Sequence, residues 1–240
     1  MSRNPSKGFG LIEIMIAMAL GLVVILGITQ VFLSAKQTSF AQSASARMQE
    51  DARYVLTRMA QELRVAGMFG CVSLSSVDDE PAAFNHPVRW NNGTKTLSII
   101  TANVSSGSGV TSNADWTLIT DCKGGGRVVG GNAAPTATNE MAFGIRQVEY
   151  QYDEDNKTLK VQSGGSGGFQ PLVSGVSAFA VSFGLAASAT EPYVSGDYES
   201  TAVAPSLIRS VRVEITLSDT SGKVRDQSYS IAAALRNRIL

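Results

Sequence analysis

The chain has 240 residues and a mass of 25.3 kDa, enough for one large domain or two small ones with a sizeable core. Its 20 basic residues balance 20 acidic ones, so composition gives no reason to expect a nucleic-acid-binding protein. One histidine, His86, and two cysteines are too few for a zinc site of three or four His and Cys ligands. This composition argues against most enzyme classes.

The N-terminal region contains a long apolar segment. Between Phe9 and Leu33 lie 25 residues with one ionisable group, Glu13. As a helix this segment is about 37 Å long, enough to cross a hydrocarbon layer of about 30 Å. Arg3 and Lys7 precede it without an acidic residue, which favours a cytoplasmic N-terminus and translocation of the rest of the chain. The sequence therefore predicts one transmembrane helix.

Three other interpretations of this segment fit less well. A secretory signal peptide has an apolar core of about 7–15 residues followed by small residues, whereas this run is longer and 29–33 is a poor cleavage site. A buried core helix would not normally be this apolar on every side at the extreme N-terminus, behind a basic leader. A plain membrane anchor explains the length but leaves Glu13 without a purpose.

Glu13 favours a more specific function than anchoring. An unpaired carboxylate near the end of a membrane span costs about 2–3 kcal/mol, and such residues usually have a dedicated partner. A cut between Gly8 and Phe9 would create an amino group one helical turn from Glu13. In staggered subunits, the amine of one chain could meet the carboxylate of the next in a low-dielectric bundle.

The stretch at 7–13, KGFGLIE, followed by the apolar helix, resembles the class III signal of type IV pilins and type II secretion pseudopilins. Gly10 stands where that family usually has threonine. The resemblance implies cleavage after Gly8 by a prepilin peptidase, which also N-methylates Phe9, and use of Glu13 in subunit registration. It further implies an inner-membrane protein with a cytoplasmic N-terminus and a periplasmic C-terminal domain, which moves to the pilus at the cell surface after assembly.

The helix is expected to continue beyond the membrane, because 36–66 lacks glycine and proline and is rich in helix formers. One continuous apolar stripe suits packing on a globular domain. The stripe comprises Phe40, Ala44, Met48, Ala52, Val55, Met59, Leu63 and Ala66. The charged residues expected on the other faces are Arg47, Glu50, Asp51, Arg53, Arg58, Glu62 and Arg64. Gly67 is the expected end of the helix.

The rest of the chain has short alternating stretches typical of antiparallel sheet. Strands are expected at 96–101, 116–120, 145–152, 159–162, 176–185, 210–217 and 224–232. The third and fourth of these form a predicted hairpin. The fold class is therefore α+β, pilin-like, with a long N-terminal helix, membrane-spanning in its first half, packed on a C-terminal antiparallel sheet. The expected parts are a leader (1–8), a transmembrane half-helix (9–33), an amphipathic half-helix (34–67) and a periplasmic β-rich domain (68–240).

Scattered segments of the mature chain resemble the PilW-type minor pilins more narrowly. These segments are GMFGC at 67–71, VEYQY at 148–152, LVSGV at 172–176 and LRNR at 235–238. The resemblance implies a low-abundance subunit that joins other minor pilins and the major pilin, on the pilus assembly platform, in a priming or tip complex. Roles in twitching motility and adhesion follow from it. A J-type pseudopilin of type II secretion is the alternative, and a membrane-anchored periplasmic enzyme is a remote third.

Cys71 and Cys122 would both lie outside the cytoplasm, where thiols oxidise, so one disulfide is favoured over two free buried cysteines. Such a bridge would close a loop of about 50 residues and stabilise the fold by about 4 kcal/mol in the loop-entropy model.

An acidic turn, two glycine runs and His86 could suggest binding or catalytic sites, but each is better explained as part of the structure. Asp153, Asp155 and Asn156 resemble part of a calcium loop but lack its glycine and terminal acid, so a solvated hairpin turn is preferred. The glycine runs at 124–126 and 164–168 lack the ending of a phosphate-binding loop and are interpreted as flexible surface connections. His86 has no evident catalytic partner. We therefore expect no enzyme, and no catalytic, cofactor or metal-binding residues.

Overall fold

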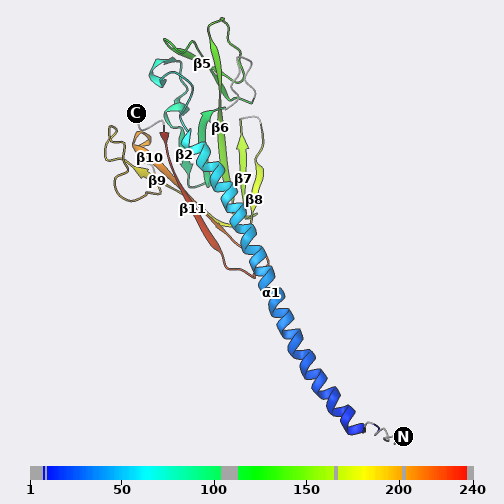
Figure 1. Cartoon of the computed structure of the whole chain (residues 1–240). Helices are drawn as coiled ribbons and strands as arrows, with labels where there is room; N and C mark the ends of the chain where they lie inside the picture. Colours follow the sequence, from blue (N-terminus) through cyan, green and yellow to red (C-terminus); the bar gives the residue numbers. More distant parts are fainter. Residues whose placement is uncertain (1–7, 9, 104–112, 165–166, 202–203, 237–240) are drawn as a thin grey trace, which may run out of the picture. The chain divides into compact units, whose positions relative to one another are not determined.

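The computed structural model describes residues 8, 10–103, 113–164, 167–201 and 204–236 (Figure 1). One long helix, α1 (Leu11–Arg64), is followed by strands and short 3-10 helices. The strands are β1 (Val77–Asp78), β2 (Val88–Asn91), β3 (Thr96–Ala102), β4 (Trp116–Thr120), β5 (Gly126–Gly130), β6 (Met141–Asp153), β7 (Thr158–Ser163), β8 (Gln170–Ser174), β9 (Val176–Leu185), β10 (Ile208–Leu217) and β11 (Gln227–Ala234). The 3-10 helices are η1 (Leu74–Ser76), η2 (Ala82–Asn85) and η3 (Pro205–Leu207).

The ends of helix α1 follow from local chemistry. At the start, the carbonyl of Gly10 accepts hydrogen bonds from the backbone N–H groups of Glu13 (3.1 Å) and Ile14 (3.3 Å). At the end, Gly67 adopts a left-handed conformation (φ +76°), which glycine reaches without a steric penalty. The helix was expected to end at Gly67. Its last residue is Arg64, three residues earlier, and residues 65–67 form the turn that follows. Phe9, the expected first residue of the helix, lies outside the described residues.

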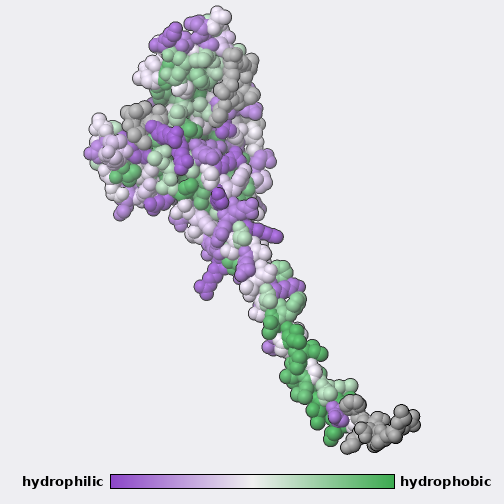
Figure 2. Space-filling model, viewed as in Figure 1, coloured by the Kyte–Doolittle hydropathy of each residue, from purple (hydrophilic) through white to green (hydrophobic). Residues whose placement is uncertain are grey.

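The chain divides into two compact units, Met1–Arg47 and Met48–Leu240. In the first unit, the large apolar side chains between Leu11 and Leu33 expose from 48% to 79% of their surface. Figure 2 shows this hydrophobic surface along the first half of the helix. Exposed apolar surface of this extent is unfavourable in water and requires another environment, such as lipid or neighbouring helices.

In the second unit, one face of α1 belongs to the main core. Its buried apolar residues are Met48, Ala52, Val55, Leu56, Met59, Ala60 and Leu63, and Ala66 is buried just beyond its end. Most of the predicted stripe is therefore confirmed as core. Phe40 and Ala44 are the exceptions: both lie in the first unit, where Phe40 exposes 47% of its surface and Ala44 is half-buried.

The described strands form two sheets rather than the single sheet that was expected. The eight-stranded sheet has the order β1-β5-β4-β6-β3-β2, with β7 paired to β6 and β8 paired to β7. The three-stranded sheet has the order β11-β10-β9 and is antiparallel. In the larger sheet only the short β1–β5 pair is parallel. The α+β class with a long N-terminal helix packed on largely antiparallel sheet is thus confirmed, and the number of sheets was wrong.

The change of sheet occurs at Gly175, between β8 and β9. Gly175 has φ +75°, and a Cβ at this position would lie 2.9 Å from the carbonyl oxygen of Ser218. The carbonyl of Gly175 also accepts the N–H of Ser218 (2.7 Å), next to the end of β10. Two adjacent strands can therefore join different sheets because glycine permits an abrupt turn against the backbone of Ser218.

The strand predictions are largely confirmed, with specific corrections. The hairpin joins β6 to β7 with Asp153 opposite Thr158. Strands β1, β2, β5 and β8 were missed, and the last strand is Gln227–Ala234 rather than 224–232. A second, smaller core lies beside the main one, where the rings of Phe69 and Phe84 stack with centroids 4.4 Å apart. Because Phe69 and Val72 belong to this second core or pack against it, the core also holds the segment that contains Cys71.

Candidate functional site

The N-terminal segment is open at the predicted processing position. Gly8 is exposed, and a Cβ built on it meets no described atom within 4 Å. Helix α1 begins at Leu11, so Gly8 precedes its first hydrogen-bonded turn. Exposed backbone outside regular structure is the kind of segment that peptidases cleave. Phe9, the residue expected to follow the cut, lies outside the described residues.

Glu13 lies in the first turn of α1 and its side chain is exposed. The ion pairs formed among the described residues do not include it. An acid in the first turn is favoured by the partial positive charge of a helix N-terminus. The carboxylate is therefore held at a defined place on the helix and is available to a cation from outside this chain.

Helix α1 is long and apolar enough to cross a membrane. Signal sequences and the core helices of soluble proteins can meet the same criterion. The exposure of its apolar part does not fit a soluble core helix. Glu13 thus lies near the N-terminal end of a candidate membrane span.

The structure joins Cys71 and Cys122 in the predicted disulfide, with Cα atoms 5.5 Å apart. The bond links the segment after α1 to the turn after β4. This turn is well ordered by hydrogen bonds: the Cys122 N–H donates to Thr120 Oγ1 (3.0 Å), and the Lys123 N–H donates to Asp121 Oδ1 (2.9 Å). Backbone hydrogen bonds from Lys123 and Gly124 lower the pKa of the Asp121 carboxyl.

We expect replacement of both cysteines by serine to lower the free energy of unfolding by about 4 kcal/mol, because the unfolded chain loses a cross-link across about 50 residues. Chemical denaturation of the full chain in detergent, with and without a reductant, measures this. The reductant should shift the wild type and leave the double variant unchanged. Non-reducing peptide mapping should recover the Cys71–Cys122 cross-link, and two freely alkylated thiols would contradict the disulfide.

Two glycines of the first run, Gly125 and Gly126, are closely packed, so the interpretation of the run as a flexible connection was wrong for them, whereas Gly124 is exposed with open space around it. A Cβ on Gly125 would lie 2.9 Å from the Ser76 carbonyl oxygen, and a Cβ on Gly126 would lie 2.9 Å from Leu118 Cδ1. Gly126 begins β5 and pairs with Val77 of β1. These glycines therefore allow two backbones to approach beside the disulfide. Of the second run, 165–166 lies outside the described residues.

Glu62 forms a buried polar network that the sequence did not reveal. It was expected on a charged face, but it exposes 8% of its surface. The Tyr150 hydroxyl donates to Glu62 Oε2 (2.7 Å), and Arg58 and Arg146 place nitrogens 3.7 and 3.8 Å from Oε1. Burial and the nearby carboxylate raise the pKa of the Tyr150 hydroxyl. One feature of the sequence could have indicated this burial: Glu62 is next to Leu63, at the border of the apolar stripe.

Replacing Glu62 with alanine should lower the free energy of unfolding by about 3 kcal/mol, because it leaves a buried hydroxyl and two arginines without their anion. Tyr150→Phe should cost about 2 kcal/mol, since it removes only one charge-assisted hydrogen bond. Glu50→Ala, at an exposed site of the same helix, is the control and should change stability by less than about 0.5 kcal/mol. Urea denaturation of the full chain measures all three, and equal stabilities for Glu62→Ala and Glu50→Ala would contradict the network.

The other candidates have ordinary structural surroundings. His86 follows η2 and is exposed beside a cavity at β2. In the β6–β7 turn, Asp153 pairs with Lys160 and accepts the Asn156 N–H (3.0 Å). Lys160, followed by Asn156, holds the pKa of the Asp153 carboxyl below its usual range. Over the described part of the chain, no three His, Cys, Asp or Glu side chains converge as a metal site.

Comparison with known proteins gives one match at this N-terminal segment. The family described as "Prokaryotic N-terminal methylation motif" matches residues 3–29, which include Gly8 and Glu13. No curated protein sequence matches the chain. Among solved structures, a type IV-like pilin from Thermus thermophilus is similar with a TM-score of 0.40 and 8% identity, over 81% of this chain and 99% of that chain. The chain therefore carries a prepilin-type methylation motif at the start of its long helix.

Proposed function

We propose that the protein is a minor pilin of the type IV pilus, of the PilW type, and part of the priming or tip complex that initiates pilus assembly. The observation that carries this proposal is the methylation motif at residues 3–29, on a helix whose apolar first part is exposed. A disulfide-bonded β domain follows the same helix. A plain anchor would need neither the motif nor Glu13.

In this proposal, residues 1–8 are a cytoplasmic leader that a prepilin peptidase removes after Gly8, with N-methylation of Phe9. Residues 9–33 span the inner membrane, 34–67 form the amphipathic part of the helix, and 68–240 form the periplasmic domain. After assembly the subunit resides in the pilus at the cell surface, with roles in twitching motility and adhesion. Lipid and neighbouring helices are both apolar, so the span can pass from one to the other without exposure to water.

Glu13 is the residue that we assign to subunit registration. When the apolar span enters a bundle of helices, a carboxylate there loses water and becomes costly unless it meets a cation. The processed N-terminal amine of a neighbouring subunit is such a cation. Only a stagger that brings the two groups together satisfies both charges, so the pair selects one register among many that apolar packing would allow.

A J-type minor pseudopilin of type II secretion is the second candidate, because the methylation motif and long helix suit it equally well. The two candidates differ in their neighbours. The minor pilin would associate with other minor pilins, the major pilin and the pilus assembly platform, whereas the pseudopilin would associate with secretion pseudopilins. The motif and the helix both favour a structural role over catalysis.

Co-purification tests the proposal. The full chain, tagged at its C-terminus, is extracted from membranes in mild detergent after co-expression with candidate minor pilins or with candidate pseudopilins. A stable complex of defined stoichiometry with minor pilins supports the proposal. A complex only with pseudopilins selects the second candidate, and monomeric behaviour with every candidate contradicts both.

A further inference from the structure

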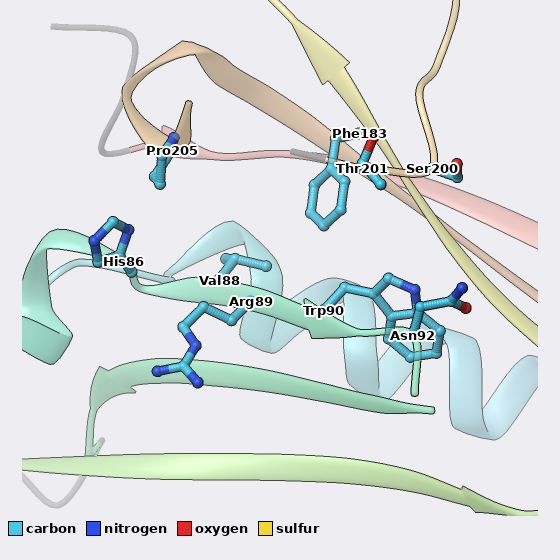
Figure 3. A pocket seen from close by; sticks show the side chains of 9 residues that line it. All are labelled: His86, Val88, Arg89, Trp90, Asn92, Phe183, Ser200, Thr201 and Pro205. Atoms are coloured by element: carbon cyan, nitrogen blue, oxygen red, sulfur yellow. The ribbon is translucent and has the colours of Figure 1, made fainter. Parts of the chain in front are cut away.

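A cavity of about 510 Å³ lies along strand β2 (Figure 3). His86, Arg89 and Trp90 line it from β2 and the turn before it, and Phe183, Thr201 and Pro205 line it from the opposite side. Figure 3 shows the latter three residues on one side of β2, with further strands of the sheet on its other side. The cavity is therefore a groove along an edge of the larger sheet.

Strand β2 is the last strand of the sheet order, and β3 is its neighbour. The Ile100 N–H donates to the Pro87 carbonyl, and Val88 lies opposite Ile99. In an antiparallel ladder the residues of a strand alternate between bonding toward and away from the neighbour. Arg89 and Asn91 therefore direct their backbone groups to β3, while Val88, which is 3% exposed, and Trp90, which is half-buried, direct theirs away from β3. No other described strand pairs with β2 on that side.

Hydrogen bonds attach described parts of the wall opposite β2 to the rest of the fold. Arg209, which is 3% exposed, holds the segment after β9 by donating to the carbonyls of Glu191 (2.6 Å) and Ala189 (2.8 Å). Glu199 and Phe183 exchange two backbone hydrogen bonds, of 2.7 and 2.9 Å, which attach the same segment to β9. A preformed groove reduces the ordering cost of binding.

The side chains along β2 define the chemistry of an occupant. Val88 and Trp90 belong to the main core or pack on it, and Trp90 contacts Phe179 edge to face with centroids 5.6 Å apart. The Arg89 side chain projects from the opposite face of the strand, is exposed, and forms no ion pair or hydrogen bond with the described residues. The described residues that line the groove include no aspartate, glutamate or lysine and no other arginine.

We propose that the β2 edge binds an extended segment of a partner protein as an added strand. The segment alternates apolar and acidic residues, so that its apolar side chains lie beside Val88 and Trp90 while an acidic side chain lies beside Arg89. The four residues of β2 span about 13 Å, so about four residues of the partner pair with it. This binding site does not depend on the proposed function.

The test uses the full chain in detergent and a fluorescent synthetic peptide, Ser-Thr-Val-Glu-Val-Thr-Ser, as the probe. Saturable binding is expected by fluorescence anisotropy. Arg89→Glu should weaken this peptide about tenfold and strengthen the corresponding peptide with lysine in place of glutamate, because the neighbouring charges become alike or opposite. Arg53→Glu, an exposed arginine outside the groove, should change neither affinity.

Backbone methylation of the peptide tests strand addition itself. Methylating the amide nitrogens of alternate residues in one set removes the N–H groups that face β2 and should abolish binding. Methylating the other alternate set leaves them intact and should preserve binding. Absence of binding, equal effects of the two methylated sets, or no response to Arg89→Glu would overturn the proposal. Concentration-dependent dimerisation that Arg89→Glu abolishes would assign the groove to a second copy and also overturn it.

Discussion

Replacing Gly8 with leucine should block removal of the leader, residues 1–8, so that all of the protein stays in the membrane as the full-length chain. A peptidase that accepts the chain at this point must bring its catalytic groups close to the backbone of Gly8, and a branched side chain prevents that approach. The Gly8 position has no described atom nearby, so the substitution should not disturb the fold. Intact-mass measurement should find the wild type shorter by residues 1–8 and the variant uncut.

Gly10 provides the matched control for this substitution. A Cβ at Gly10 likewise meets no described atom, and threonine is common there in the signal that the sequence resembles. Gly10→Thr should therefore be processed like the wild type. A wild-type chain that still begins at Met1 would contradict both the processing prediction and the minor-pilin proposal.

Replacing Glu13 with alanine should give a subunit that is inserted and processed normally but is incorporated poorly into the pilus or its priming complex. Insertion does not need the acid, because alanine makes the span more apolar. Assembly does need it in our proposal, because the processed amine of a neighbouring subunit would lose its partner in a low-dielectric bundle. Quantitative detection in sheared pilus fractions, relative to the membrane pool, measures incorporation.

Two further variants make the Glu13 experiment specific. Glu13→Asp keeps the charge and shortens its reach, so it should restore part of the incorporation that alanine loses. Glu50→Ala removes an exposed acid from the same helix, beyond the apolar span, and should have little effect. Equal incorporation of the wild type and all three variants would show that Glu13 has no role in assembly.

The helix could be predicted because its signals are local. The apolar run of its first part, the absence of glycine and proline from 36–66, the apolar stripe at helical spacing and Gly67 at the end depend only on neighbours in sequence. Strands β4 and β9 were found with their observed limits for the same reason, since each is a continuous or alternating apolar stretch. The site residues at the N-terminus were predictable too, because Gly8 and Glu13 belong to one short motif.

The strands that the sequence did not predict are those whose formation depends on pairing with strands distant in sequence or on their place in the sheet. β5 begins at Gly126, a residue that weakens an isolated strand, and its place depends on close approach to β1. β8 contains Pro171, which cannot donate a ladder hydrogen bond, yet among the described strands β8 pairs with β7 alone and is therefore an edge strand, where proline is tolerated. The division into two sheets likewise depends on contact between Gly175 and Ser218, which are far apart in sequence.

Glu62 shows the same limit for side chains. Helical spacing placed it on a charged face, and only the fold brings Tyr150 and Arg146 to it. A charge at the border of an apolar stripe can be exposed or buried, and the choice depends on whether other elements supply donors. The partners that decided it here come from β6, almost ninety residues later in the chain.

The Cys71–Cys122 bond also has a mechanical consequence. Tension applied between α1 and β6 would be carried across the two sulfur atoms, bypassing the stretch between the cysteines. That stretch contains β1 to β4, including the edge strand β2. If these strands separated under load, about 170 Å of contour length would still be withheld from extension, since an extended residue spans about 3.4 Å. Reduction of the bond would release this hidden length, so the oxidised protein should be the less extensible one.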